Sequence, residues 1–361
     1  MGNAQRYMSG VWLTGHGDFD KLELRSDIPR PQPGDGEVLI RVSAAGINNT
    51  DINTRIGWYS KHDAAAADAS WTGEPIRFPR IQGADVCGYI EHVGHGVDER
   101  RIGERILIEP CLTEAGGKRL EPPWYLGSEC DGGFAEYVVV AARHAHRIES
   151  DLSDIELASF PCSYSTAENL LTRAGVAAGE RVLVTGASGG VGSAAVQLLQ
   201  ARGAKAIALT SAAKAESLLA LGTTRTVLRS EDLVAALGEN SVDVVVDLVG
   251  GSSWPSLLQV LRPHGRYAVS GAIAGPLVEL DLRTLYLKDL SLFGCTVLDE
   301  AVFPRLVDHI EQGRIQPLVA SSFALEDIAS AQQLFLEKKH TGKIVLNVNA
   351  DKAPSSTSTA G

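Results

Sequence analysis

A glycine-rich run at residues 182–193 constrains the fold of this chain more than any other feature. An apolar strand pattern at 182–184 stops at a cluster of small residues, and a helical pattern begins within that cluster. Glycines let a backbone turn tightly and approach an anion, while the free amides and positive dipole end of a helix face it. Small or apolar residues then recur on one helix face, and Gly203 stands where a terminating glycine is expected. The run predicts a diphosphate-binding turn; a plain strand-to-helix connection is the alternative.

The end of the next predicted strand indicates which dinucleotide binds. An NAD site usually has an acidic residue about 20 residues beyond the first glycines, where it accepts hydrogen bonds from the ribose 2′-hydroxyl. The strand at 206–209 is followed instead by Thr210, Ser211 and Lys214, with no carboxylate among residues 210–214. Hydroxyls and an ammonium bind a 2′-phosphate by charge-assisted hydrogen bonds, so the sequence favours NADP over NAD. An ordinary helix cap at Ser211 and a solvated Lys214 are the alternative.

From about residue 181 to residue 296, strand patterns alternate with helical patterns. This alternation predicts an α/β domain in which helices cover both faces of a parallel sheet and the ligand binds at the carboxyl ends of the strands. The pattern at 242–249 is β-branched and almost wholly apolar, as central parallel strands are, and Gly250 and Gly251 end it. Six strands are predicted, at 182–184, 206–209, 226–228, 242–249, 266–269 and 290–293.

The first 150 or so residues have a different pattern, and a chain of 361 residues is long enough for two domains. Short alternating strands, such as 38–42 and 105–108, are separated by Pro and Gly turns, which predicts a β-rich, barrel-like domain. Residues 64–69, within 61–79, have the composition of an inserted surface loop, either a plain insertion or a cover over a cleft. The polar ending at 353–361 predicts a disordered tail.

Charge and cysteine content exclude several classes of protein. The formal net charge is −11, whereas nucleic acids and anionic membranes bind basic surfaces. No apolar stretch approaches membrane-spanning length, and the N-terminus has no signal-peptide core. The five cysteines are scattered and form no C-x-x-C pair, which fits reduced thiols rather than a disulfide framework. We therefore expect a cytoplasmic protein that binds neither nucleic acid nor membrane.

Short motifs occur in a fixed order along the chain. They are AGINNTD at 45–51, GADVCGYI at 83–90, GERI at 103–106, GGFAEY at 132–137, STA at 165–167, the glycine-rich run, and TGKIVL at 341–346. In this order they resemble the medium-chain dehydrogenase/reductase superfamily, and within it the zinc-independent quinone oxidoreductase branch. The resemblance implies a GroES-like barrel domain at 1–158, completed by 303–350, and a Rossmann domain at 159–302, before a tail at 351–361. It also implies an active site in the cleft between the domains.

The resemblance bears on whether the site holds a metal. Zinc alcohol dehydrogenases of this superfamily bind a catalytic zinc with Cys, His and Cys, and these positions match Asn48, Ala84 and Cys162 here. Asp85 stands where those enzymes have a nearby carboxylate and could ligate with Cys162, but the amide of Asn48 is a poor zinc ligand. The four-cysteine structural zinc lobe is missing, and no histidines have a ligand spacing. We expect no metal, with Cys162 as a buried apolar residue.

The resemblance and the predicted fold together imply the cofactor positions. Thr166 resembles the family threonine that contacts the nicotinamide end, and Gly271 and Ala272 leave room for the ring after the fifth predicted strand. Arg229 stands where relatives place an aromatic or basic residue beside the adenine ribose, and would complete the 2′-phosphate clamp with Ser211 and Lys214. A solvated strand end is the alternative for Arg229. The residues expected around the diphosphate are Gly186, Ser188, Gly189, Gly190, Val191 and Gly192.

By the same resemblance, Asn48 and Asp51 lie at the cleft floor beside the nicotinamide, and Tyr59 lies on the substrate side. Asn48 can donate a hydrogen bond to an acceptor oxygen, Asp51 suits the orienting of a neighbour or cofactor hydroxyl, and Tyr59 reaches the substrate. As alternatives, Asn48 caps a turn, Asp51 is the N-cap of a short helix, and Tyr59 belongs to the surface of the barrel. The chain departs from the quinone reductase pattern at Asn53, where an active-site tyrosine is common.

A nicotinamide cofactor in a site without a metal ion restricts which substrates the protein can reduce. Hydride transfer is still feasible when a conjugated acceptor spreads negative charge onto a carbonyl oxygen that accepts hydrogen bonds. The sequence therefore predicts an NADPH-dependent reductase of a quinone or an α,β-unsaturated carbonyl compound. An alcohol or carbonyl dehydrogenase of the same superfamily and a nucleotide-binding protein without turnover are the alternatives. The resemblance also implies a homodimer or homotetramer, in which residues 290–297 extend the sheet across subunits.

Overall fold

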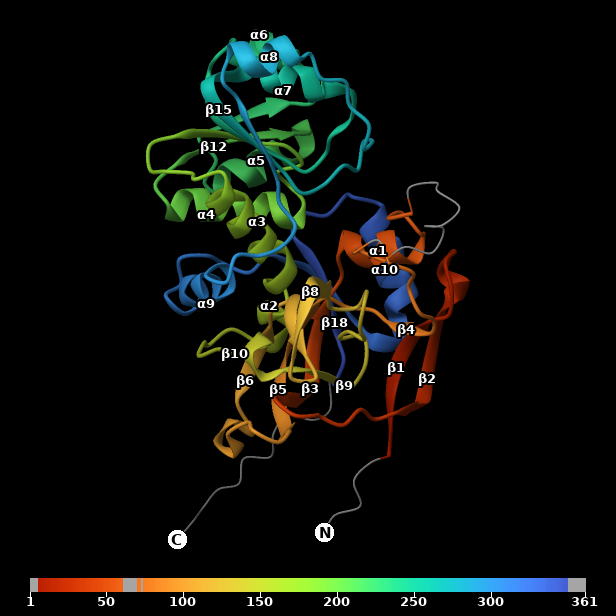
Figure 1. Ribbon diagram of the computed structural model, residues 1–361. Coiled ribbons are helices and arrows are strands. Elements are labelled where there is room, and N and C mark those ends of the chain that lie inside the picture. Colours follow the sequence, from red (N-terminus) through yellow and green to blue (C-terminus); the bar gives the residue numbers. More distant parts are fainter. Residues whose placement is uncertain (1–5, 61–69, 73, 350–361) are drawn as a thin grey trace. The chain divides into compact units, whose positions relative to one another are not determined.

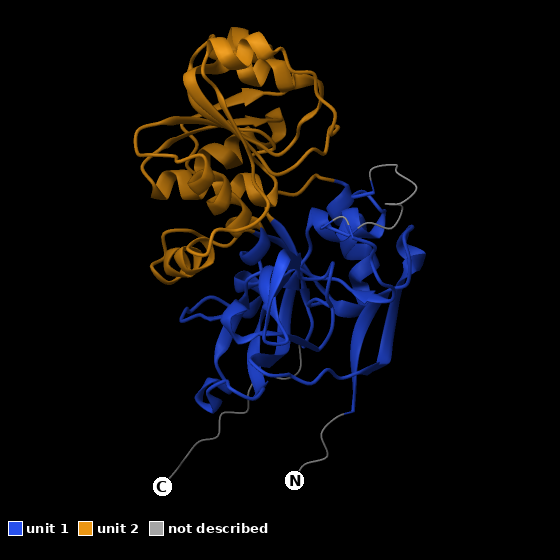
Figure 2. Cartoon of the chain, viewed as in Figure 1, with its two compact units in different colours: residues 1–162, 319–337, 343–361 blue, residues 163–318, 338–342 orange. Residues whose placement is uncertain are grey.

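The computed structural model describes residues 6–60, 70–72 and 74–349, and the chain divides into two compact units (Figures 1 and 2). Unit 1 comprises residues 1–162, 319–337 and 343–361, and unit 2 comprises 163–318 and 338–342. The predicted inserted loop at 64–69 and the predicted tail at 351–361 lie outside the described residues. Within these ranges, every helix is too short or too polar to pass through a bilayer.

Unit 1 is rich in β-structure, as the turn-punctuated pattern of the first 150 residues predicts. Its three helices are α1 (Asn49–Arg55), α2 (Asp154–Leu157) and α10 (Ile328–Leu336), counted within the described residues. Its strands are β1 (Tyr7–Leu13), β2 (Leu22–Pro29), β3 (Glu37–Gly46), β4 (Arg80–Ile81), β5 (Asp85–Val93), β6 (Arg105–Ile108), β7 (Cys111–Ala115), β8 (Lys118–Tyr125), β9 (Tyr137–Ala141), β10 (Ala145–Arg147), β17 (Val319–Ala324) and β18 (Lys343–Asn347).

Strand β3 is the centre of the largest sheet in unit 1. This sheet has the order β10-β6-β5-β3-β18-β17, and β9 also pairs with β3. Nearly every residue of β3 is buried, which explains its almost continuous apolar sequence. The antiparallel pairing of β18 with β3 brings the end of the chain back beside the turn after Gly46, where the amide of Ile47 donates to the carbonyl of Ile344. Two smaller sheets have the orders β2-β1-β4 and β7-β8.

Unit 2 contains a six-stranded parallel sheet in the order β13-β12-β11-β14-β15-β16. This order reverses direction between β11 and β14, as in doubly wound nucleotide-binding folds, so the predicted fold class is confirmed. The strands are β11 (Arg181–Val184), β12 (Lys205–Thr210), β13 (Arg225–Leu228), β14 (Val242–Asp247), β15 (Leu261–Val269) and β16 (Ser291–Gly294). The helices are α3 (Pro161–Arg173), which starts in unit 1, α4 (Gly190–Ala201), α5 (Ala212–Ala220), α6 (Leu233–Leu237), α7 (Trp254–Val260), α8 (Leu282–Leu287) and α9 (Val302–Glu311).

The unit boundaries differ from the domain boundaries expected at 158 and 303. Residues 159–162 belong to unit 1, whereas 303–318, with most of helix α9, belong to unit 2. The guanidinium of Arg305 lies 2.9 Å from the buried carboxylate of Glu168 on α3. The hydroxyl of Tyr164, also on α3, donates to the carbonyl oxygen of Gln316 at 2.8 Å. These contacts keep the segment on unit 2, and the chain returns to unit 1 only at β17.

Candidate active site

The glycine-rich run forms the turn between β11 and α4, as its sequence predicts. Gly186 has a φ of 58°, a backbone conformation that residues other than glycine rarely adopt. A Cβ atom on Gly192 would overlap the carbonyl oxygen of Gly186, so this approach requires glycine. Helix α4 has 12 residues, and the first amides of a helix lack acceptors within it. The turn is therefore a cradle whose backbone donors and close approach fit a diphosphate.

A buried carboxylate that the sequence analysis missed organises the same edge of the sheet. Asp247, the last residue of β14, accepts hydrogen bonds from the hydroxyls of Thr185 and Tyr267, both at 2.6 Å. It also accepts from the backbone amides of Val249 and Gly250, at 2.9 and 3.2 Å. These bonds turn the chain after Asp247, which is why β14 ends two residues before the apolar pattern at 242–249 does.

The turn after β14 brings the predicted cofactor residues together. A Cβ on Gly186 would lie 3.2 Å from Val249, and one on Gly271 would lie 2.8 Å from the carbonyl of Leu248. Gly271 and Ala272 thus lie at the same sheet edge as the glycine-rich run, which continues through Ser188, Gly189, Gly190 and Val191. Thr166 is half-buried on helix α3.

The four residues predicted to bind a 2′-phosphate lie at the ends of β12 and β13. The amide of Arg229 donates to the carbonyl of Thr210 at 2.9 Å, and Ser211 is the N-cap of α5 without a side-chain capping bond. The buried hydroxyl of Thr210 has no hydrogen-bond partner among the described residues. The exposed guanidinium of Arg229 likewise has neither hydrogen bond nor ion pair within the described ranges.

Lys214 is bound to the chain more tightly than the sequence suggests. Its ammonium donates to the carbonyls of Lys338 and His340, at 2.8 and 2.7 Å, and so is not the solvated lysine considered above. Burial, and then the positive charge of Arg229, lower the pKa of Lys214. The ammonium retains one of its three N–H donors for a ligand.

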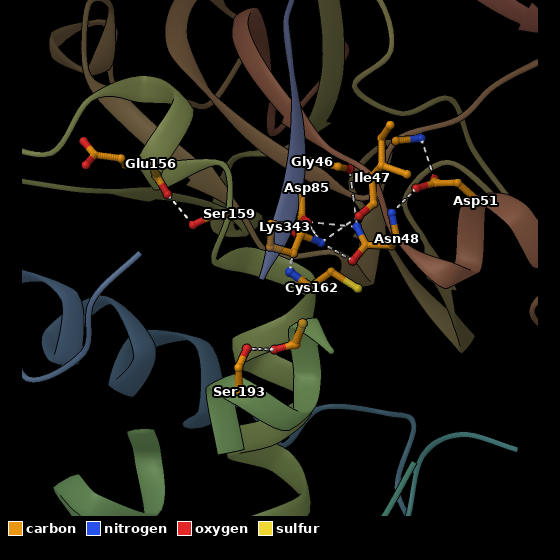
Figure 3. A network of polar contacts seen from close by, with 12 residues as sticks. Gly46, Ile47, Asn48, Asp51, Asp85, Glu156, Ser159, Cys162, Ser193 and Lys343 are labelled. Atoms are coloured by element: carbon orange, nitrogen blue, oxygen red, sulfur yellow. Dashed lines mark hydrogen bonds and ion pairs between the residues drawn. The ribbon is translucent and has the colours of Figure 1, made fainter. Parts of the chain in front are cut away.

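The second constellation lies in unit 1, around the turn between β3 and α1 (Figure 3). Asn48 precedes α1, and its amide donates to the carboxylate of Asp51 at 2.7 Å. The other oxygen of Asp51 accepts from the amide of Gly83 at 3.2 Å. Burial raises the pKa of Asp51 to about 7, although the hydrogen bond from Asn48 and the charge of Lys343 oppose this shift.

Asn48, Asp85 and Lys343 form one buried polar cluster, which we call the Lys343 cluster (Figure 3). The ammonium of Lys343 lies 2.7 Å from Asp85 Oδ2 and donates to Asn48 Oδ1 at 2.5 Å and to the Ile47 carbonyl at 3.0 Å. The Asn48 Nδ2 group donates to Asp85 at 2.9 Å and to the carbonyl of Gly46 at 3.4 Å. Asp85 Oδ1 accepts from the backbone amide of Cys162 at 2.5 Å.

Two tyrosines and a thiol lie near this cluster. Tyr59 donates to the hydroxyl of Thr50 at 3.2 Å, and burial raises its pKa, so the phenol is neutral. Tyr125, which the sequence analysis missed, places its hydroxyl 3.0 Å from Cys162 Sγ and stacks on Trp71. Burial, followed by the charge of Asp85, raises the pKa of Cys162 to about 12, so the sulfur is a thiol at neutral pH.

Comparison with known proteins identifies the family. Two family models match, the alcohol dehydrogenase GroES-like domain over residues 34–150 and the zinc-binding dehydrogenase over 190–312. A crystal structure from Sinorhizobium meliloti 1021, provisionally assigned as an alcohol dehydrogenase, is 46% identical with a TM-score of 0.88, covering 95% of this chain and 97% of that one. The chain belongs to the medium-chain dehydrogenase/reductase superfamily.

Its relatives include quinone oxidoreductases, as the motif order predicts. Human quinone oxidoreductase is 28% identical over 360 residues, covering 96% of this chain and 99% of the relative. Acryloyl-coenzyme A reductase of Metallosphaera sedula is 29% identical over 349 residues, covering 94% and 99%. The predicted resemblance to the quinone oxidoreductase-like branch is confirmed, and so are the GroES-like and Rossmann domains. The protein is thus an oxidoreductase with a nicotinamide-dependent dehydrogenase fold.

The zinc that many members of this superfamily bind does not fit the residues at the matched positions. Asn48 offers a carboxamide and Ala84 a methyl group, and neither is a good zinc ligand. The carboxylate of Asp85 is already paired with the ammonium of Lys343, whose charge repels a cation. Within residues 6–60, 70–72 and 74–349, no group of three or more His, Cys, Asp or Glu side chains could hold a metal ion.

The buried histidine of unit 1 has a structural role. His144 Nε2 accepts from the amide of Thr113 at 3.0 Å, so its Nδ1 is the protonated nitrogen and donates to Glu109, also at 3.0 Å. His146 contacts the same carboxylate at 3.4 Å. Although burial opposes it, hydrogen bonding from His144 and His146 lowers the pKa of Glu109.

Proposed function

We propose that this protein is an NADPH-dependent reductase of quinones or α,β-unsaturated carbonyl compounds that works without a metal ion. The Lys343 cluster is the main support, because a carboxamide and a methyl group, Asn48 and Ala84, stand at two of the three positions matched to zinc ligands, and the ammonium of Lys343 binds Asn48 and Asp85 beside them. Without a Lewis acid, the substrate itself has to delocalise the negative charge that reduction creates, and conjugated carbonyl compounds do so. The quinone oxidoreductase and acryloyl-coenzyme A reductase relatives agree with this class.

Unit 2 would hold the dinucleotide. A bound nicotinamide supplies the hydride. The glycine-rich turn would bind the diphosphate with its amides, while Thr166, Gly271 and Ala272 would orient and make room for the ring. Preference for NADPH is supported by the Thr210 hydroxyl and the Arg229 guanidinium, which are unpaired as far as the structure describes the chain, with Ser211 and Lys214 beside them.

Unit 1 would bind the acceptor. The side-chain nitrogen Nδ2 of Asn48 donates one hydrogen to Asp85 Oδ2 at 2.9 Å and the other to the carbonyl oxygen of Gly46 at 3.4 Å. The longer bond is weak, so this hydrogen can be redirected to a substrate oxygen at little cost. Tyr59 is a neutral hydroxyl whose single hydrogen is donated to Thr50 at 3.2 Å and would have to turn to a substrate oxygen, and Asp51 orients Asn48 through the backbone amide of Asn48.

A substrate panel tests this function. NADPH oxidation is measured with quinones, enones, aldehydes and ketones, and NADP⁺ reduction is measured with the matching alcohols. We expect turnover with quinones or enones to exceed alcohol oxidation, and NADPH to be preferred to NADH. Faster alcohol oxidation would favour the alternative dehydrogenase function, which the 46% identical structure assigned as an alcohol dehydrogenase supports. Dinucleotide binding without turnover of any compound would indicate a non-catalytic protein.

We also propose a cytoplasmic homodimer or homotetramer. All five cysteines lie in the described residues and none of them forms a disulfide bond there, which agrees with a reducing compartment. Strand β16 is the last strand in the order of the parallel sheet of unit 2, so one of its edges is unpaired. In the segment between β15 and β16, Leu277, Leu282 and Leu287 are 91%, 64% and 71% exposed, and exposed leucines of this kind suit contact with a second copy of the chain.

A further inference from the structure

The ammonium of Lys343 is almost completely removed from solvent and fully hydrogen-bonded. The side chain is 4% exposed, and its three N–H groups have three acceptors, on Ile47, Asn48 and Asp85. Since no N–H remains, Lys343 does not itself donate to a substrate in this arrangement. Its effect must instead pass through the groups that it holds.

The first of these groups is the side-chain amide of Asn48. With Oδ1 facing the ammonium, Nδ2 has to face Asp85 and the carbonyl of Gly46, because a flipped amide would place two donors together. The positive charge of Lys343 therefore determines which way Asn48 presents its hydrogens. A neutral side chain at position 343 would remove this preference.

The second group is Asp85, which has a charge with no exposure to water. Lys343 supplies the opposite charge at 2.7 Å, and without it a buried carboxylate would be left unpaired. The other oxygen of Asp85 accepts a hydrogen bond from the backbone amide of Cys162 in the first turn of α3. A negative charge at this end of a helix also interacts favourably with the helix dipole. Lys343 thus joins the turn after β3, the start of β5 and the start of α3.

We propose that Lys343 is a positioning residue that replaces a metal ion in this site, its ammonium supplying the fixed positive charge that orients Asn48 and holds Asp85. The inference rests on the proposed function, in which Asn48 binds the acceptor oxygen. A metal would orient the acceptor by binding it directly, whereas Lys343 acts through the amide of Asn48. Removal of the groups that orient metal ligands costs about 10- to 100-fold in metal affinity or activity, and we expect a loss of similar size here because Lys343 orients Asn48 in the same way.

Three variants test the proposal. Lys343→Met removes the charge and leaves Asp85 unpaired, while Lys343→Met with Asp85→Asn removes both charges and avoids an unpaired buried carboxylate. The matched control is Lys288→Met, since the ammonium of Lys288 also has three acceptors, the carbonyls of Leu258, Gln259 and Leu261 in unit 2. Each protein is measured for thermal unfolding, NADPH affinity, and kcat and KM with a quinone that the wild type reduces.

We expect Lys343→Met to lower both the melting temperature and kcat, the latter by about 10- to 100-fold. The double variant should regain most of the melting temperature and keep the loss in kcat, with NADPH affinity unchanged. The control should lose stability without losing kcat. A double variant with the kcat of the wild type would overturn the proposal, because the pair would then be structural only. If Lys343→Met does not fold, the double variant alone decides the question.

A second readout keeps this inference separate from the proposed function. In isotope-labelled protein, the Asn48 side-chain amide signals, assigned with Asn48→Ala, report whether the amide is fixed. If the Asn48 amide hydrogens are protected from solvent exchange in the wild type but not in the double variant, positioning by Lys343 is supported. Equal protection in both proteins would contradict it. If the wild type reduces neither quinones nor enones, the proposed function fails while this measurement still decides the role of Lys343.

Discussion

Arg229→Ala is expected to weaken the binding of NADPH selectively. The guanidinium is exposed and, in the part of the chain that the structure describes, unpaired, so its removal leaves no buried group without a partner. A hydrogen bond between charged groups contributes about 1.5 to 3 kcal/mol, which corresponds to roughly a 10- to 150-fold change in Kd. NADH lacks the 2′-phosphate, so its Kd should stay within about 0.5 kcal/mol of the wild-type value, roughly twofold.

Fluorescence titration with both dinucleotides, at one fixed ionic strength because salt screens exposed charges, measures the two constants. Arg225→Ala is the matched control. Arg225 begins β13, four residues before Arg229, is also exposed, and donates to the carbonyl of Ala236. This control should leave the ratio of the two Kd values unchanged. Equal weakening of NADPH and NADH by Arg229→Ala, or no weakening at all, would refute the role assigned to Arg229.

Three further predictions concern other parts of the structure. Gly192→Ala should weaken NADPH and NADH alike, by about 1 to 3 kcal/mol in a titration, because its Cβ would overlap the Gly186 carbonyl. Gly189→Ala, whose Cβ would lie 3.4 Å from the carbonyl oxygen of Gly186, should have a much smaller effect, and similar losses would argue against a tight cradle. Because the pKa of Asp51 is raised from 3.8 to about 7, its contribution to the unfolding free energy should fall as pH rises between these values. Urea unfolding should show a shallower decline for Asp51→Asn over that range, and parallel curves would contradict the buried, protonated carboxyl. Leu287→Glu should reduce the molar mass in light scattering to that of a monomer, and an unchanged oligomer would exclude the exposed Leu287 from the interface.

The parts of the structure that depend on local chemistry were predictable from the sequence. The turn between β11 and α4 follows from glycines placed between an apolar strand and a helical pattern, and Gly203 has a φ of 72° just after the helix, as expected of a terminating glycine. The parallel sheet follows from alternating periodicities. In each case the deciding residues are neighbours in the sequence, so composition and spacing contain the information.

Contacts between distant segments were not predictable in this way. Lys343 and Asn48 are 295 residues apart, and although the TGKIVL motif was recognised, nothing in it indicates which carboxylate its lysine pairs with. The acceptors of Lys214 lie 124 and 126 residues further along the chain, which is why a solvated lysine was a reasonable alternative. The apolar side chains of Leu248 and Val249 extend the predicted strand at 242–249 two residues beyond the end of β14, and only the hydrogen bonds to Asp247 show why the strand stops.

If hydride transfer in this site needs no metal ion, the rate of quinone reduction should not depend on zinc. The rate of NADPH-dependent quinone reduction is compared before and after dialysis against a chelator, with the zinc content determined on the same samples. We expect equal rates before and after dialysis, no stoichiometric zinc, and no stimulation when zinc is added back. A rate that is lost on chelation and restored by zinc would contradict this expectation.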